Sequence, residues 1–231
     1  YQDAIQDYYK VLEFDSTDID AINSIGLIYQ DQGKIDLAIE TYEKGITLEK
    51  TNPESAAYCY SNRALIFENQ GKTDKALKDY DRAIELDPEF DLHPRNRGML
   101  YEELGEWDKA YEDYTTAIEI QFIYENKNLL NRALLCEKMQ NYNQATKDFK
   151  DAIKNDPNDA QIIAGYAFYL VRIGKYDKGL QQFENAIKVD SSNTMIYFNR
   201  AKAYLFNQNS EKAIDEYKTV IQIDPDDPEG Y

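Results

Sequence analysis

The spacing of apolar residues along the chain is helical, and short polar turns interrupt it at regular intervals. Between residues 60 and 67 the apolar positions lie three or four residues apart, and the same spacing resumes between residues 76 and 84. The dipeptide Gly71-Lys72 separates the two stretches. Because this spacing places side chains on one face of an α-helix, the pattern predicts a helix, a short turn and an antiparallel helix.

This helix–turn–helix unit recurs along the chain at steps of 38, 34, 35, 34 and 34 residues. The turn residues are Gly33, Gly71, Gly105, Gln140, Gly174 and Gln208. Five positions after them stand the small residues Ala38, Ala76, Ala110, Ala145, Gly179 and Ala213. Seven positions before them stand Gly26, Ala64, Gly98, Ala133, Ala167 and Ala201. Three markers in one register predict an array of helix pairs, in which small residues let the two helices approach closely.

The unit resembles the tetratricopeptide repeat, a pattern of about 34 residues with small, aromatic and turn positions in a fixed order. The matching positions in one unit are Gly98, Tyr101, Gly105, Ala110, Tyr114 and Ala117. The resemblance covers almost the whole chain. It implies an all-α fold, a right-handed α-solenoid of stacked antiparallel helix pairs.

We expect one array over residues 1–231. Its six full repeats are placed at 19–52, 57–90, 91–125, 126–159, 160–193 and 194–227. A lone second helix at 1–15 and the start of a further repeat at 228–231 lead us to expect a fragment of a longer array. Two departures stand out: four extra residues separate the first two full repeats, and Phe122 ends the third where proline is expected.

Composition and charge exclude several classes of protein. The chain is 42% hydrophobic and 13% aromatic, which is too apolar for a disordered protein. Its formal charge of −17 disfavours binding to nucleic acid or to an anionic membrane surface. No stretch approaches the roughly 20 apolar residues of a membrane helix. Two cysteines and no glycosylation sequon favour a cytoplasmic location, with the cilium or mitochondrion as alternatives.

The sequence offers little to an enzyme, so we expect no catalytic, cofactor-binding or metal-binding residues. His93 is the only histidine, which removes histidine pairs and most nucleophile–histidine arrangements. Cys136 takes a position that is aromatic or aliphatic in the other repeats, which predicts a small buried apolar residue. Gly71-Lys72-Thr73 resembles the end of a phosphate-binding loop, but Ile66 stands where that motif requires glycine.

Variation between the repeats predicts an internal set of ion pairs. Arginine precedes the small residue of the first helix in four repeats, at Arg63, Arg97, Arg132 and Arg200. The same four repeats carry an acid before the second-helix aromatic, at Asp79, Asp113, Asp148 and Glu216. We therefore expect an arginine–carboxylate contact within each of these repeats.

An asparagine precedes each of these arginines, at Asn62, Asn96, Asn131 and Asn199. The resemblance implies that this position faces the concave groove, where asparagine would bind a ligand backbone, as in the repeat arm of O-linked N-acetylglucosamine transferases. The alternative is that the asparagines complete the internal arginine network. The carboxylate clamp of chaperone-binding members is not expected, because Gly165 and Met195 stand where that clamp requires polar residues.

The family's concave positions predict a graded groove. Acidic positions are Asp20, Asp31, Glu68, Glu102 and Glu103; the apolar floor is Leu65, Met99 and Leu134; and the aromatic or aliphatic end is Phe168, Val171, Phe198, Leu205 and Phe206. Such a groove favours a partner segment that is basic in one part and apolar in another.

The sequence therefore predicts a non-enzymatic scaffold for protein–protein interaction, part of a larger complex, that binds an extended or helical segment in a concave groove. Two alternatives stay open at this point. The array could be an architectural subunit of a large stable assembly, for example in a cilium or organelle, held by its edges and ends. It could also be the arm of an enzyme whose catalytic domain lies outside this chain.

Overall fold

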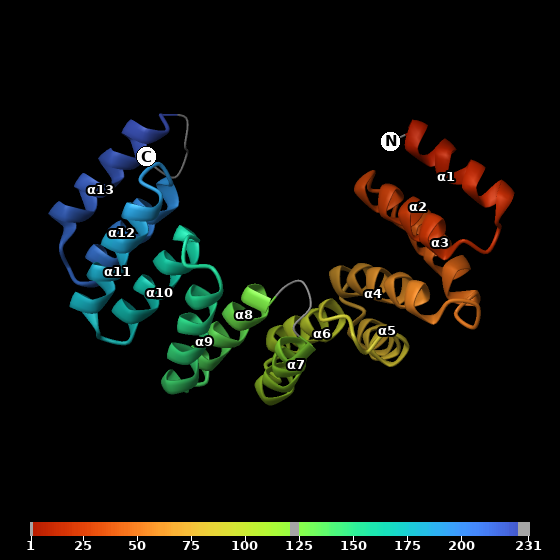
Figure 1. The fold of residues 1–231 in the computed structure, drawn as a ribbon, viewed down its shortest axis with the longest axis horizontal. Coiled ribbons are helices and arrows are strands. Elements are labelled where there is room, and N and C mark those ends of the chain that lie inside the picture. The colour runs from red at the N-terminus through yellow and green to blue at the C-terminus, as the bar shows by residue number, and fades with distance from the viewer. Residues whose placement is uncertain (1, 121–124, 226–231) are drawn as a thin grey trace. The chain divides into compact units, whose positions relative to one another are not determined.

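The computed structural model of the protein describes residues 2–120 and 125–225. All regular elements in these two stretches are α-helices, as the spacing predicts. The chain divides into two compact units, Tyr1–Asn128 and Leu129–Tyr231. Within each unit, successive helices run antiparallel to one another (Figure 1). The expected repeat end at Phe122 and the expected new repeat at 228–231 lie outside the described residues.

The described residues of the first unit form seven helices and the start of an eighth. They are α1 (Gln2–Phe14), α2 (Ile19–Asp31), α3 (Ile35–Thr47), α4 (Pro53–Asn69), α5 (Thr73–Leu86), α6 (Leu92–Glu103) and α7 (Trp107–Ile120). The second unit takes most of α8 (Glu125–Lys138), followed by α9 (Tyr142–Asn155), α10 (Ala160–Arg172), α11 (Tyr176–Val189), α12 (Thr194–Phe206) and α13 (Ser210–Ile223). No helix of the described chain is long and apolar enough to cross a bilayer.

Each turn between paired helices uses one residue with positive φ. The φ angles are 70° at Gly33, 68° at Gly71, 75° at Gly105, 60° at Gln140, 79° at Gly174 and 58° at Gln208. The next residue donates its N–H to the carbonyl five positions back, as from Lys34 to Tyr29 and from Lys72 to Phe67. These bonds satisfy carbonyls at the end of the first helix, so the turn both ends one helix and starts the next.

The small residues allow the close approach of helices that the repeat pattern predicts. A Cβ atom at Gly26 would lie 2.3 Å from the Tyr42 ring, and one at Gly179 would lie 2.6 Å from a Val171 methyl group. Tyr42, Tyr80 and Phe183 are completely buried beside such positions. The cores of both units therefore consist of aromatic side chains that pack against alanine and glycine.

Helix α4 is longer than the repeat spacing suggests. Residues 53–56, which the spacing placed between two repeats, form its first turn. The Asn52 side chain accepts the N–H of Ser55, and Pro53 occupies the first helical position. Both features favour a helix start at this point. Ser55 and Ala56 are consequently buried rather than part of a surface connection.

Candidate functional site

The four predicted arginine–carboxylate pairs are all present. Arg63 Nε lies 2.8 Å from Asp79 Oδ2, Arg97 Nη2 2.6 Å from Asp113 Oδ1, Arg132 Nη2 2.8 Å from Asp148 Oδ1, and Arg200 Nη2 3.0 Å from Glu216 Oε2. The three aspartates each accept two hydrogen bonds from one guanidinium. These aspartates are buried, so each charge is neutralised by an arginine of the same repeat.

Three of these arginines also reach a carboxylate on the second helix of the preceding repeat. The distances from Nη1 are 3.5 Å for Arg63–Glu43, 2.6 Å for Arg97–Asp81 and 2.5 Å for Arg200–Glu184. We call these three-residue sets arginine bridges. Sequence reasoning missed their second carboxylate, although a signal exists. An acid follows the second-helix aromatic before these arginine repeats, whereas Lys150 precedes the repeat that carries Tyr166.

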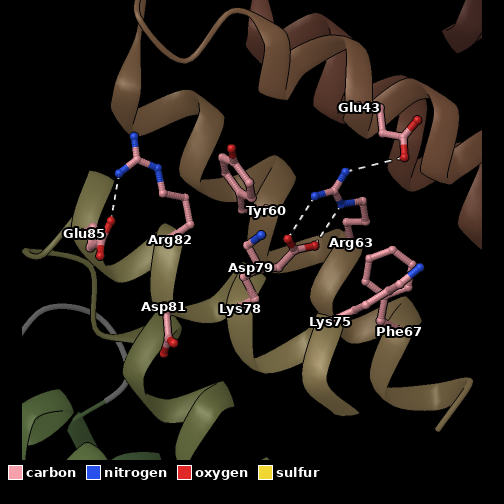
Figure 2. A pocket seen from close by; sticks show the side chains of 10 residues that line it. All are labelled: Glu43, Tyr60, Arg63, Phe67, Lys75, Lys78, Asp79, Asp81, Arg82 and Glu85. Carbon is pink, nitrogen blue, oxygen red and sulfur yellow. Dashed lines mark hydrogen bonds and ion pairs between the residues drawn. The ribbon is translucent and has the colours of Figure 1, made fainter. Parts of the chain in front are cut away.

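One of these arginine bridges lines a pocket of about 690 Å³ between α3, α4 and α5 (Figure 2). The pocket contains four acidic side chains, and each has a cationic partner. Glu43 and Asp79 face Arg63, Glu85 lies 2.7 Å from Arg82, and Asp81 binds Arg97. The charges of this pocket are therefore compensated within the protein, and the ion pairs that line it connect neighbouring repeats.

Two of the predicted groove carboxylates hold buried tyrosines. The hydroxyls of Tyr80 and Tyr114 each donate to a carboxylate at 2.8 Å, on Glu68 and Glu102 respectively. Burial raises the pKa of Glu68, and the Tyr80 hydrogen bond opposes that rise. The sequence contains a signal for these hydrogen bonds, because tyrosine rather than phenylalanine occupies both positions. Glu103, by contrast, is exposed on α6.

The asparagine side chains do not join the arginine network. Asn62 donates to Asn23 Oδ1 at 2.8 Å, which links the first helices of two neighbouring repeats. Asn96, Asn131 and Asn199 are partly exposed, and their side chains form no hydrogen bond within the described residues. Their amide groups are thus available to a ligand, which is the reading that the family resemblance implies.

The predicted apolar positions are only partly accessible. Met99 is 45% exposed and Leu134 is 42% exposed, whereas Leu65, Phe168 and Phe198 are half-buried. In the second unit, Arg172 lies over the Phe168 ring at 5.0 Å and Lys202 over the Phe198 ring at 4.1 Å. These aromatic faces are therefore already in contact with cations of the chain.

The prediction that Val171 lies in the groove is wrong. Its side chain is 1% exposed and packs in the core of the second unit. The cause lies on the facing helix, where Gly179 has no side chain and a valine methyl group fills the space. Leu205 and Phe206 are exposed, at 46% and 62%.

The two cysteines and the single histidine of the sequence are buried. Desolvation raises the pKa of Cys59 to about 12 and that of Cys136 to about 11, and both thiols are free. Burial lowers the pKa of His93 to about 4. Cys136 is therefore a buried apolar residue, as the repeat pattern predicts. Within residues 2–120 and 125–225, no group of three or more His, Cys, Asp or Glu side chains could hold a metal ion.

Comparison with protein families finds one family over most of the chain. Models of the tetratricopeptide repeat match residues 19–52, 57–90, 96–124, 127–159 and 169–228. The sequence has no match among curated proteins.

Solved structures share the fold at low sequence identity. Yeast Tom70 is 18% identical with a TM-score of 0.71, and the match covers 99% of this chain and 49% of that one. PilF of Pseudomonas aeruginosa is 17% identical with a TM-score of 0.68, over 92% and 94% of the two chains. YrrB, described as a repeat protein of this kind with an unusual peptide-binding site, is 22% identical with a TM-score of 0.56, over 83% and 96%.

Proposed function

The chain belongs to the tetratricopeptide repeat family, and we propose that it is a non-enzymatic scaffold whose first helices bind an extended or helical segment of a partner protein. The fold is typical of protein–protein interaction. Burial keeps both thiols protonated near neutral pH and makes the imidazole of His93 a weak base, which favours a non-catalytic role for all three.

The observation that carries this proposal is a set of accessible apolar side chains at one position of successive first helices. Leu27, Leu65 and Met99 directly follow the small residues of α2, α4 and α6. Leu27 is 40% exposed, Met99 is 45% exposed and Leu65 is half-buried. Apolar side chains exposed at equivalent positions of a stacked array favour a binding surface, since a solvated helix face would carry polar residues there.

The charge of the same helices favours a partner with basic residues. Asp20, Asp31 and Glu103 are exposed acids on the first helices of the first unit. Carboxylates beside an apolar stripe attract Lys and Arg and accelerate encounter, and the apolar side chains slow dissociation. A basic–apolar segment satisfies both features. The cytoplasmic location rests on the cysteine and sequon content alone, and it stays a prediction.

The test is a titration of a fluorescent basic–apolar peptide against the protein and against Glu103→Lys. Glu103 is the better choice than Glu102, because Glu102 binds the hydroxyl of Tyr114. The matched control is Glu112→Lys, an exposed acid on the second helix α7. We expect Glu103→Lys to weaken binding several-fold at low salt and less at high salt. Equal affinity of all three proteins at both salt concentrations would contradict the proposal.

A further inference from the structure

A second pocket, of about 450 Å³, lies between α2, α4 and the connection that follows α5. It is lined by Asp20, Asn23, Ser24, Glu54, Ser55, Tyr58 and Asp87. We propose that this pocket is a subsite for the ammonium or guanidinium group of a basic side chain in the bound protein segment. This inference rests on the proposed function, and it specifies where on the first helices a basic residue is recognised.

The pocket contains three carboxylates and no cationic side chain. Asp20 and Glu54 form no ion pair within the described residues, and Asp87 faces no Lys or Arg there. The pocket in Figure 2 is different, because every carboxylate in it has an arginine partner. A bound cation would give the second pocket the compensation that the first already has.

Asp87 is the carboxylate that most needs a partner. Its side chain is only 14% exposed, and the nearest ionisable nitrogen, His93 Nε2, lies 4.0 Å from Oδ2. His93 is completely buried, and neither of its ring nitrogens has a hydrogen-bond partner. Burial keeps this imidazole neutral near pH 7, so it does not balance the charge of Asp87.

Ser55 supplies an independent sign of a ligand. The residue is 7% exposed and lines the pocket, yet its hydroxyl has no hydrogen-bond partner among the described residues. The hydroxyl oxygen is therefore free to accept an N–H from a ligand in the pocket. The Asn52 side chain accepts the backbone N–H of Ser55, and this bond fixes the first turn of α4 beside the pocket.

The chemistry favours an organic cation over a metal ion. In the described part of the chain the pocket's carboxylates are not grouped closely enough to coordinate a metal. Several separated acceptors in a pocket of this size suit the end of a Lys or Arg side chain, whose N–H groups point in different directions. Asn62 binds Asn23, one of the lining residues, so the pocket adjoins the asparagine row.

The first experiment uses N-acetyl-lysine methylamide as the probe and its norleucine analogue as the neutral control. Backbone amide signals of Ser55 and Asp87 in ¹⁵N NMR spectra report binding. We expect saturable shifts with the lysine compound only. Asp87→Asn should weaken binding about tenfold, because a charged hydrogen-bond partner is lost. Glu54→Gln, at an exposed position, should weaken it less than about fivefold.

The control variant is Asp108→Asn, which changes an exposed aspartate on α7. Asparagine at position 87 can still accept the N–H of Glu89, so the variant keeps that backbone contact. Equal shifts with the norleucine analogue, unchanged affinity in Asp87→Asn, or saturable shifts with calcium chloride in place of the lysine compound would each overturn the subsite.

The second experiment separates this inference from the proposed function. Each lysine of the basic–apolar peptide is replaced by norleucine in turn, and binding is measured to the unmodified protein and to Asp87→Asn. Replacement of one particular lysine should lower the affinity of the peptide about tenfold for the unmodified protein and only slightly for Asp87→Asn. Equal costs at every lysine in both proteins would overturn the subsite and leave groove binding intact. Binding of the lysine compound without binding of the peptide would support the pocket and contradict the proposed function.

Discussion

At the scale of single residues, an arginine bridge joins side chains that cannot be separated without leaving a charge in the interior. Arg97 is 23% exposed and its partner Asp113 is 7% exposed at the side chain. The attraction between two such groups offsets the cost of removing both from water, so the pair adds modest net stability. The loss of one partner is more costly, because the other charge stays buried without compensation.

The first prediction concerns this asymmetry. Arg97→Ala should lower the free energy of unfolding by about 3 kcal/mol, and Asp113→Ala by a similar amount. The double variant should lose much less than the sum, since the two residues share one interaction. Urea denaturation of the four proteins measures the coupling.

The control is the exposed pair of Lys218 and Asp215, whose side chains are 64% and 67% exposed. Lys218→Ala should change the free energy of unfolding by less than about 1 kcal/mol. Fully additive effects of the Arg97 and Asp113 substitutions would show that the ion pair carries no coupling energy.

The second prediction concerns two glycines with opposite surroundings. A Cβ atom at Gly165 in α10 would meet only the Phe149 ring, at 3.9 Å. Packing therefore does not require glycine at this position. Gly165→Ala should raise the free energy of unfolding by about 0.5–1 kcal/mol, because alanine restricts the unfolded chain and favours helix. Gly26→Ala should destabilise the protein, since its Cβ would overlap Tyr42. Thermal unfolding that ranks the two variants the other way would contradict this reading.

The third prediction follows from the buried histidine. The pKa of His93 is about 4 in the folded protein, against 6.5 ordinarily. Above pH 6.5 both states are neutral; below it the unfolded state binds a proton that the folded state does not, so stability is lost as the pH falls toward 4. The loss amounts to about 3 kcal/mol.

His93→Phe removes this titration while it keeps an aromatic ring against Tyr58 and Phe90. Urea denaturation at pH 7 and at pH 4 should therefore show a smaller loss in the variant, by about 3 kcal/mol. An equal loss in both proteins would mean that folding does not lower the pKa of His93.

At the scale of helices and turns, the repeat depends on one left-handed residue per turn. Glycine adopts this conformation at little cost, whereas Gln140 and Gln208 adopt it with φ angles of 60° and 58°. A side chain in this region is strained by about 1 kcal/mol. The two glutamine turns are therefore weaker than the glycine turns, although their hydrogen bonds are the same.

The fourth prediction is that Gln140→Gly raises the free energy of unfolding by about 1 kcal/mol, because it relieves this strain. Gly71→Gln, at a φ angle of 68°, is the reciprocal change and should lower it by about the same amount. Thermal unfolding of both variants tests the pair. A stabilising Gly71→Gln would show that φ does not limit these turns.

The sequence predicts the helices and turns well because the chain contains several versions of one unit. Repetition exposes positions that vary together, as Arg63 and Asp79 do. Prediction from repeated positions fails where a structural feature occurs only once in the chain. The longer start of α4 depends on Asn52 and Pro53, which have no counterpart in the other repeats. The pocket beside Ser55 depends on that start, so no comparison between repeats could reveal it.

At the scale of the whole molecule, the excess of acids opposes the compact state. The formal charge of −17 means that acidic side chains repel one another, and folding strengthens this repulsion because it brings them closer together. The arginine bridges contribute little to its relief, since each arginine is already matched by carboxylates. Most of the remaining acids are exposed, where dissolved salt screens them.

The fifth prediction is therefore that sodium chloride stabilises the protein. The melting temperature should rise as the salt concentration increases from about 0.02 M to 0.5 M, because surface repulsion is screened more strongly than the buried pairs are. Asp36→Asn/Asp74→Asn/Asp177→Asn, three exposed aspartates in first turns of second helices, should show a smaller rise. A melting temperature that falls with salt would indicate that attractive surface pairs dominate.

The second carboxylate of each arginine bridge belongs to the preceding repeat, and this has a consequence for how such an array can be rearranged. Asp81 pairs with Arg97 of the next repeat, and Glu184 pairs with Arg200 of the next repeat. At the corresponding position stands Lys150, and the next repeat carries Tyr166 in place of arginine. A shuffled gene that placed the Lys150 repeat directly before the Arg200 repeat would set two cations against each other. The repeats are thus not interchangeable modules, because the side chains at each junction restrict which repeats can be neighbours.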